Sequence, residues 1–208
     1  MIKDQLEAEF VKSSAKPSQC PDPNKPEYAF IGRSNVGKSS LINKLVNNRK
    51  LAKISGRPGK TTLINHFLVE KTWYLVDLPG YGYAKVSKKD REKWILETRK
   101  YLLDRKNLIC TFLLLDSRIP RQKIDAEFME WMGKKGIPFV MVFTKIDKLS
   151  SREWGKNRSA YIKKMQNEWK SLPEMFYTSA ENGMGRTEML QFIENYNGTF
   201  KRPIAKLL

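Results

Sequence analysis

Cysteine, histidine and long apolar runs are scarce in this chain. Its 208 residues include one histidine and two cysteines, Cys20 in a polar segment and Cys110 in an apolar run. Two cysteines placed so differently make neither a disulfide framework nor a zinc site. No stretch approaches the roughly 20 apolar residues that cross a bilayer, and residues 1–16 contain no apolar signal core. We therefore expect a soluble, cytoplasmic protein without membrane insertion.

Acidic residues are also in short supply. Asp and Glu number 22 against 39 Lys and Arg, which gives a formal net charge of +17 at pH 7. A surplus of this size attracts polyanions and indicates a nucleic-acid or ribonucleoprotein partner. The basic residues concentrate in segments 85–106 and 152–170. Such runs are usually solvated helix faces, which is the alternative interpretation.

Short apolar runs alternate with longer amphipathic ones from residue 27 onward. We predict strands over 27–31, 63–70, 72–77, 108–116, 137–144 and 175–178, and helices over 38–46, 87–104, 123–134, 151–170 and 184–195. Alternating strands and helices form a mostly parallel sheet with helices on both faces, and the tight link between the second and third strands requires a hairpin. The prediction is a three-layer α/β fold with a mostly parallel six-stranded sheet and one antiparallel edge strand.

The chain divides into one domain with two short flanks. Residues 14–26 are rich in Pro, Ser and Asp, as in a connecting segment. We predict an N-terminal extension over 1–26, a single domain over 27–196 and a basic tail over 197–208. We expect a monomer, with the sole histidine, His66, on the surface beside the hairpin.

A glycine-rich segment follows the first predicted strand and precedes the first predicted helix. It matches the phosphate-binding pattern G-x-x-x-x-G-K-S/T with Gly32, Arg33, Ser34, Asn35, Val36, Gly37, Lys38 and Ser39. The backbone N–H groups of such a loop surround phosphates together with the helix N-terminus. We expect Lys38 to reach the β- and γ-phosphates of a nucleotide and the Ser39 hydroxyl to bind Mg²⁺.

A D-x-x-G motif ends the third predicted strand. It consists of Asp77, Leu78, Pro79 and Gly80. Asp77 would hold Mg²⁺ through water, because Mg²⁺ keeps part of its hydration shell. Gly80 has no side chain, so its N–H can approach the γ-phosphate.

Two segments that follow the last two predicted strands indicate which nucleotide base the protein binds. The first contains Thr144, Lys145, Ile146 and Asp147. The Asp147 carboxylate can accept the two neighbouring N–H groups that guanine offers and adenine lacks, and the Lys145 stem would lie along the purine. The second contains Thr178, Ser179 and Ala180, whose backbone N–H groups would meet the guanine carbonyl oxygen. GTP and GDP are therefore the expected ligands, and an ATP-hydrolysing enzyme is the disfavoured alternative.

The loop after the first predicted helix carries Gly59, Lys60, Thr61 and Thr62. A threonine hydroxyl there would complete the Mg²⁺ shell when a γ-phosphate draws the loop inward, which is the basis of an ordering switch. The spacing of the loop does not choose between Thr61 and Thr62. A binding module that uses nucleotide only to order its loops is a second alternative.

Taken in order, these segments resemble the five motifs of translation-factor-type GTPases. The string D-L-P-G-Y-G-Y-A at 77–84, with R-P-G-K-T at 57–61 before it, is similar to the EngB (YihA/YsxC) family of the TrmE–Era–EngA–YihA–septin group. The resemblance implies a Ras-like P-loop GTPase domain that acts in late assembly of the large ribosomal subunit and in normal cell division and septation. Its implied partners are the RNA and protein of that subunit or its precursor.

The family pattern also implies residue roles. Thr61 becomes the switch threonine, so the implied catalytic residues are Lys38, Thr61 and Gly80, and Mg²⁺ is held by Ser39, Thr61 and, through water, Asp77. Thr144 stands where most GTPases carry Asn, and its hydroxyl predicts a weaker contact with the base or the glycine-rich loop.

Two further positions bear on hydrolysis. Tyr81 stands where Ras-like enzymes carry the Gln that orients the attacking water. Intrinsic hydrolysis should therefore be slow and stimulated by a partner or an ion. Asn35 occupies the position that binds K⁺ in some relatives; the alternative is that it only hydrogen-bonds within the loop.

Overall fold

The computed structural model describes residues 3–52, 63–81 and 88–201. The strands are β1 (Ala8–Ser14), β2 (Glu27–Gly32), β3 (Ile64–Val69), β4 (Trp73–Asp77), β5 (Leu108–Asp116), β6 (Phe139–Thr144) and β7 (Met175–Tyr177). The helices are α1 (Lys38–Val46), α2 (Lys88–Asp104), α3 (Lys123–Lys134), α4 (Ser151–Gln166) and α5 (Arg186–Asn197), with 3₁₀ turns η1 (Pro17–Gln19) and η2 (Ile146–Lys148). None of the helices in these ranges is both long enough and apolar enough to cross a membrane.

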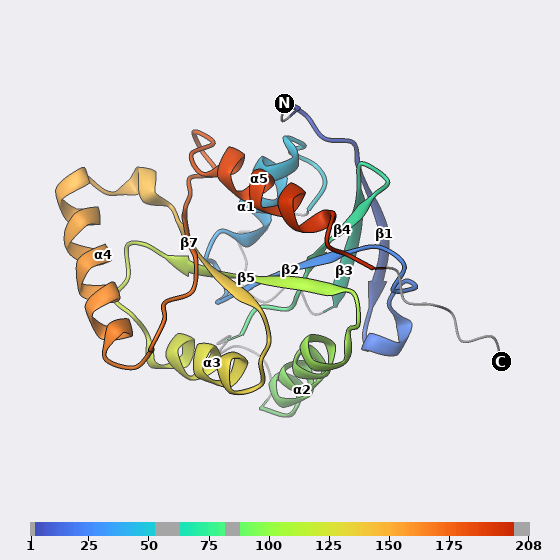
Figure 1. Cartoon of the computed structure of the whole chain (residues 1–208), viewed down its shortest axis with the longest axis horizontal. Helices are drawn as coiled ribbons and strands as arrows, with labels where there is room; N and C mark the ends of the chain where they lie inside the picture. The colour runs from blue at the N-terminus through green and yellow to red at the C-terminus, as the bar shows by residue number, and fades with distance from the viewer. Residues whose placement is uncertain (1–2, 53–62, 82–87, 202–208) are drawn as a thin grey trace.

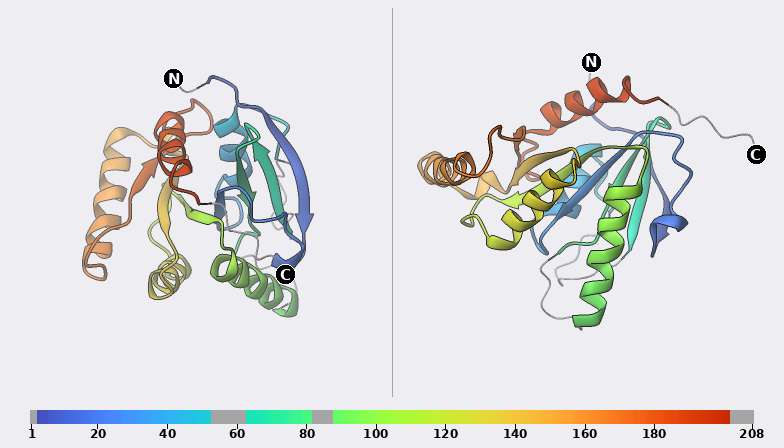
Figure 2. Two further views of the ribbon diagram at one scale, coloured as in Figure 1. Left: turned by 45° about the vertical axis from the view of Figure 1, so that its right-hand side comes forward. Right: turned by 60° about the horizontal axis from the view of Figure 1, so that its bottom comes forward.

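The strands of the described residues form one sheet in the order β1-β3-β4-β2-β5-β6-β7. β2 pairs in parallel with β4 and β5, and β6 pairs in parallel with β5 and β7. β3 is antiparallel to both β4 and β1. The predicted hairpin and the mostly parallel sheet are confirmed. Helices lie on both sides of the sheet, as the left view of Figure 2 shows.

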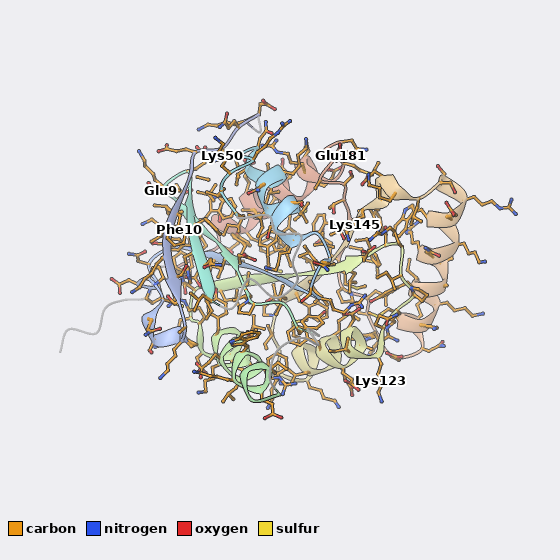
Figure 3. The ribbon with its side chains drawn as sticks, turned by 180° about the vertical axis from the view of Figure 1, so that it is seen from behind. Glu9, Phe10, Lys50, Lys123, Lys145 and Glu181 are labelled. Atoms are coloured by element: carbon orange, nitrogen blue, oxygen red, sulfur yellow. The ribbon has the colours of Figure 1, made fainter. Side chains whose placement is uncertain are left out.

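The sheet has seven strands rather than the predicted six, because β1 adds an outer strand from the segment predicted as an extension. As a result β3, the antiparallel strand, is not at the edge. Most β1 side chains are exposed, so its sequence shows no apolar alternation. Glu9 and Phe10 lie at this outer edge in Figure 3. β1 is held by backbone pairing to β3, with a bulge between Phe10 and Lys12, and backbone pairing leaves little signal in sequence.

The core lies on both faces of the sheet, which explains the continuously apolar strands. All six residues of β2 are buried. Tyr28 and Phe30 pack into a cluster with α1 and α5, whereas Ala29 and Ile31 pack into a second cluster with α2, α3 and α4. Because both faces of β2 are covered, the glycine-rich loop that follows it starts from a rigid position.

A buried ionic cluster lies at the start of β2, at the opposite end of that strand from the loop. The Glu27 carboxylate accepts from Tyr101 Oη at 2.6 Å and from Arg105 Nε and Nη2 at 2.9 and 2.6 Å. His66 Nε2 lies 3.3 Å from it, and both side chains are fully buried. Burial raises the pKa of Glu27, but the contacts with His66 and Arg105 outweigh burial and lower it to about 2. The predicted surface position of His66 is therefore wrong.

Removal of the Arg105 guanidinium should destabilise the fold strongly. In Arg105→Met the buried Glu27 carboxylate keeps only Tyr101 and His66, and a buried charge that loses its partner costs about 3 kcal/mol or more. Urea unfolding at pH 7 measures this loss. Lys100→Met is the matched control, because in the described part of the chain the half-exposed Lys100 pairs with Glu97 alone, and a surface pair is worth at most about 1 kcal/mol. Equal losses in the two variants would contradict the prediction.

Candidate functional site

The predicted nucleotide motifs converge at the carboxyl ends of the parallel strands, where open α/β sheets bind ligands. The glycine-rich loop follows β2, the D-x-x-G motif follows β4, and the two base segments follow β6 and β7. Figure 3 labels Lys145 at this edge of the sheet. Gly59, Lys60, Thr61 and the alternative Thr62 lie outside the described residues, so their roles remain predictions.

The glycine-rich loop has a backbone conformation that requires glycine at two positions. A Cβ on Gly32 would lie 2.7 Å from the Leu114 carbonyl oxygen, so β2 and β5 could not pack as closely with any other residue. Gly37 has φ +100° and is the N-cap of α1, so the N-cap residue has no side chain that could bond to the first N–H groups of this helix. A helix N-terminus without such a cap suits an anion such as phosphate.

Lys38 and Asp77 meet inside the site. The Lys38 ammonium donates to Asp77 Oδ1 as an ion pair, and the two residues are only 8% and 3% exposed. Asp77 ends β4 and Lys38 begins α1, so the fold brings the proposed phosphate and metal ligands together. The hydroxyl of Ser39 and the carboxylate of Asp77 are hard oxygen donors, which fit Mg²⁺ better than softer metals. No cluster of three or more His, Cys, Asp or Glu side chains elsewhere in the described ranges competes for a metal.

Gly80 lies directly against the glycine-rich loop. A Cβ at this position would be 3.0 Å from Gly32 O and 3.5 Å from Ser34 N. The next residue, Tyr81, donates its N–H to Gly32 O at 3.2 Å and forms a bridge with Arg33. The D-x-x-G motif thus lies against the glycine-rich loop through backbone contacts, and the role of the Gly80 N–H stays a prediction.

Lys145 joins the base segment to the glycine-rich loop. Its backbone has φ +61°, and its ammonium donates to Asn35 O at 2.6 Å and to Asp116 Oδ2 at 2.8 Å. The Thr144 hydroxyl lies 2.6 Å from Val36 O and 3.2 Å from Leu115 O. A hydroxyl has one proton and can satisfy only one of these acceptors, whereas an Asn amide has two N–H groups. The predicted contact with the loop is present, and it is a single bond.

Asp147 presents a carboxylate oxygen that suits a guanine donor. Ser179 and Lys148 hold the pKa of Asp147 below its ordinary value, so it is ionised at neutral pH. The Ser179 hydroxyl accepts N–H groups from Glu181 and Asn182 at 3.2 and 3.3 Å, which leaves its proton for Asp147. Lys148 Nζ lies 3.1 Å from the buried Oδ2 of Asp147, without the alignment of a hydrogen bond within the described ranges, so the carboxylate keeps the capacity to accept from a ligand.

Asp116 is a residue of the candidate site that sequence reasoning missed. It ends the otherwise apolar β5 and accepts from both Arg118 and Lys145. Burial raises the pKa of Asp116, but the bonds from Arg118 and Lys145 prevail and lower it to about 2. Asp116 therefore fixes the Lys145 ammonium beside the glycine-rich loop. The one available signal was a carboxylate at the end of a buried strand.

Comparison with known proteins agrees with this geometry. Residues 27–145 match the family described as "50S ribosome-binding GTPase". A protein of Phocaeicola vulgatus named "Probable GTP-binding protein EngB" is 53% identical over 196 residues, which cover 94% of this chain and 98% of that protein. The relatedness thus extends over nearly the full length of both chains.

Two solved structures share the fold. The crystal structure of a probable GTP-binding protein engB aligns with a TM-score of 0.63 at 24% identity over 84% of this chain and 100% of that chain. Era in complex with MgGDPNP and part of 16S ribosomal RNA aligns with a TM-score of 0.67 at 21% identity over 89% of this chain and 61% of that chain. These alignments show the P-loop GTPase fold.

Proposed function

The chain belongs to the EngB family of GTP-binding proteins and is a GTPase, and from this premise we propose that it is a switch that docks on the large ribosomal subunit or its precursor. In this proposal GTP favours docking and hydrolysis to GDP favours release. The protein then acts in late assembly of that subunit, and cell division with normal septation depends on it. The proposal is supported by the ribosome-binding family match and by the charge of +17.

The residues of the site have distinct tasks in the cycle. Lys38 neutralises phosphate charge, the N–H of Gly80 detects the γ-phosphate, and Asp147 selects guanine. Mg²⁺, held by Ser39 and through water by Asp77, would neutralise charge that develops on the transferred phosphoryl group.

We further expect the intrinsic hydrolysis to be slow. The Tyr81 hydroxyl bonds to Asp125 on α3 at 2.9 Å, so it is not available to orient water. A partner, or K⁺ held through Asn35, would supply the missing stabilisation.

The observation that supports the docking proposal best is the unpaired charge of α4. Six basic side chains lie on or just after this helix: Arg152, Lys156, Arg158, Lys163, Lys164 and Lys170. Among the described residues none of the six forms an ion pair. The two carboxylates of the segment are engaged elsewhere, Glu153 in the helix cap and Glu168 with Arg121. On α3, in contrast, Lys123 and Lys134 both pair with glutamates.

The position of α4 also suits a docking surface. The helix lies at one end of the molecule, far from β1 at the other end (Figure 1). Lys156, Lys163 and Lys164 are exposed. Binding to phosphates costs unpaired and exposed cations little free energy, because no internal ion pair has to be broken. The release of counterions then favours binding.

Co-sedimentation with purified large subunits tests the proposal. Protein bound to a non-hydrolysable GTP analogue should bind more tightly than protein bound to GDP, by about 1–3 kcal/mol, the usual range of coupling between two sites. Depletion of the protein in its host should lead to accumulation of precursor large subunits and to impaired septation. Equal binding with GTP, GDP and no nucleotide would rule out the switch, although the chain would remain a GTPase.

Removal of two positive charges from α4 should make the docking affinity less dependent on salt concentration. The double variant Lys156→Gln and Lys163→Gln removes two phosphate contacts, so the slope of log affinity against log salt should become shallower by about 0.7–0.9 for each contact. GTP affinity should not change, because neither lysine belongs to the nucleotide site. The matched control is Lys123→Gln with Lys134→Gln, which removes the same charge from paired positions on α3. An identical salt slope in the α4 variant and the parent would place the docking surface elsewhere.

A further inference from the structure

A three-residue contact links the two phosphate motifs to α3. Tyr81, which follows Gly80, donates its hydroxyl to Asp125 Oδ1 at 2.9 Å. Arg33, the second residue of the glycine-rich loop, places Nε 3.3 Å from Asp125 Oδ2. Asp125 lies in the first turn of α3 and is 3% exposed. One buried carboxylate therefore holds a residue from each of the two motifs that surround the phosphates.

The chemistry of this contact favours a fixed arrangement. Burial raises the pKa of Tyr81 well above its ordinary value, so the phenol keeps its proton and remains a donor. Burial also raises the pKa of Asp125, while Tyr81 and Arg33 oppose that effect. The N-terminal turn of a helix stabilises a carboxylate through the helix dipole. A hydrogen bond to a buried charged acceptor is among the stronger kinds.

Packing alone does not hold the Tyr81 ring. On one side the ring contacts Phe128, with centroids 4.9 Å apart. On another side lies a cavity of about 220 Å³ between α2 and α3, lined by Tyr81 together with Pro79, Gly80, Trp94 and Ile95. These two helices are neighbours on one face of the sheet in Figure 2. Without its hydroxyl bond the ring has space to turn into the cavity, and the peptide that joins Gly80 to Tyr81 would then depend on the Tyr81 N–H bond to Gly32 O without support from the side chain.

We propose that Asp125 is a positioning residue for GTP hydrolysis, which holds Tyr81 and Arg33 together so that the Gly80 N–H faces the phosphate loop. Gly80 is adjacent to Tyr81 and lies against Gly32 and Ser34. A shift of Tyr81 therefore alters the place of the N–H that meets the γ-phosphate. GDP lacks that phosphate, so its binding depends much less on the contact. The proposal concerns the hydrolysis step and does not depend on the ribosomal partner.

Single-turnover hydrolysis at saturating GTP and Mg²⁺ tests this role. Tyr81→Phe keeps the ring and its contact with Phe128 but removes the bond to Asp125. The rate constant should fall at least about tenfold, since small displacements of a catalytic group have effects of that order. The dissociation constant for GDP should stay within about twofold of the parent, because the GDP phosphates do not contact the Gly80 N–H. Asp125→Ala should reduce the rate further, and Asp125→Asn should restore part of it, because an amide oxygen still accepts from Tyr81.

Tyr28→Phe is the matched control. Its hydroxyl lies 3.0 Å from both Ile193 O and Asn197 Oδ1 and donates its one proton to one of them, on the sheet face that packs against α5. This variant should lose comparable thermal stability and keep the parent hydrolysis rate. The proposal is overturned if Tyr81→Phe hydrolyses GTP at the parent rate. It is equally overturned if Tyr28→Phe slows hydrolysis as much as Tyr81→Phe does, because the effect would then be one of general destabilisation.

Discussion

Asp147→Asn should change the preferred base from guanine to xanthine. Asparagine replaces one carboxylate oxygen with an N–H₂ donor, which opposes a guanine N–H and suits the carbonyl that xanthine has in its place. A site that loses partners for buried polar groups discriminates by about 10⁴-fold. The Asp147 carboxylate, whose Oδ2 is paired with Lys148 without a well-aligned hydrogen bond, is the group that would meet guanine. The variant should therefore bind GTP about 10⁴-fold more weakly than the parent.

Competition between labelled GTP and XTP measures the change in base preference. XTP should bind the variant more tightly than GTP, and this gain of function separates altered recognition from misfolding. Asp104→Asn, at the end of α2 and remote from the base segments, is the control and should keep the guanine preference. Unaltered GTP affinity in Asp147→Asn would show that another residue reads the base.

Lys38→Ala should nearly abolish nucleotide binding. The ammonium is expected to form two charge-assisted bonds with phosphate oxygens, each worth about 1.5–3 kcal/mol, so affinity should fall by about 10²–10⁴-fold. The structure adds a second effect, because Lys38 is also the partner of Asp77. We expect the fold without nucleotide to persist at reduced stability, since Asp77 would be left buried and unpaired.

A double variant separates the two roles of Lys38. Lys38→Ala with Asp77→Ala removes both buried charges, so thermal stability should recover while nucleotide binding stays lost. Isothermal titration with GTP and Mg²⁺ gives the affinity, and circular dichroism gives the melting temperature. Lys50→Ala, an exposed change just beyond α1, is the control. Measurable GTP binding by the double variant would mean that Lys38 serves packing rather than phosphate.

Local signals account for the parts of the fold that were predicted well. The predicted bounds of α1, α3 and β5 match the structure, because each has strong periodicity or a continuous apolar run between clear ends. The glycine-rich loop and D-x-x-G motif were found because each carries its chemistry in consecutive residues. The positions of Lys38, Gly80, Lys145 and Asp147 around one site then followed from strand order alone.

Contacts between distant residues account for the misses. β1 was not predicted because its sequence is polar and its pairing with β3 uses backbone groups. His66 was placed on the surface because nothing near it in sequence indicates Glu27 as a buried partner. Asp125 looks like an ordinary acidic residue in the first turn of a helix, and only the fold shows that it meets Tyr81 and Arg33.

The strand β1 has a consequence for how the chain is made. It precedes its partner β3 in the chain and is already made when β3 is synthesised, since Ala8 pairs with Val69 and Ser14 with Ile64. Without β1, the newly formed β3–β4 hairpin would have an open edge that another chain could join in a crowded cell. The other edge strand, β7, is only three residues long and offers little to pair with. We therefore expect β1 to cover the outer edge of β3 once the hairpin forms, and so to limit aggregation during synthesis.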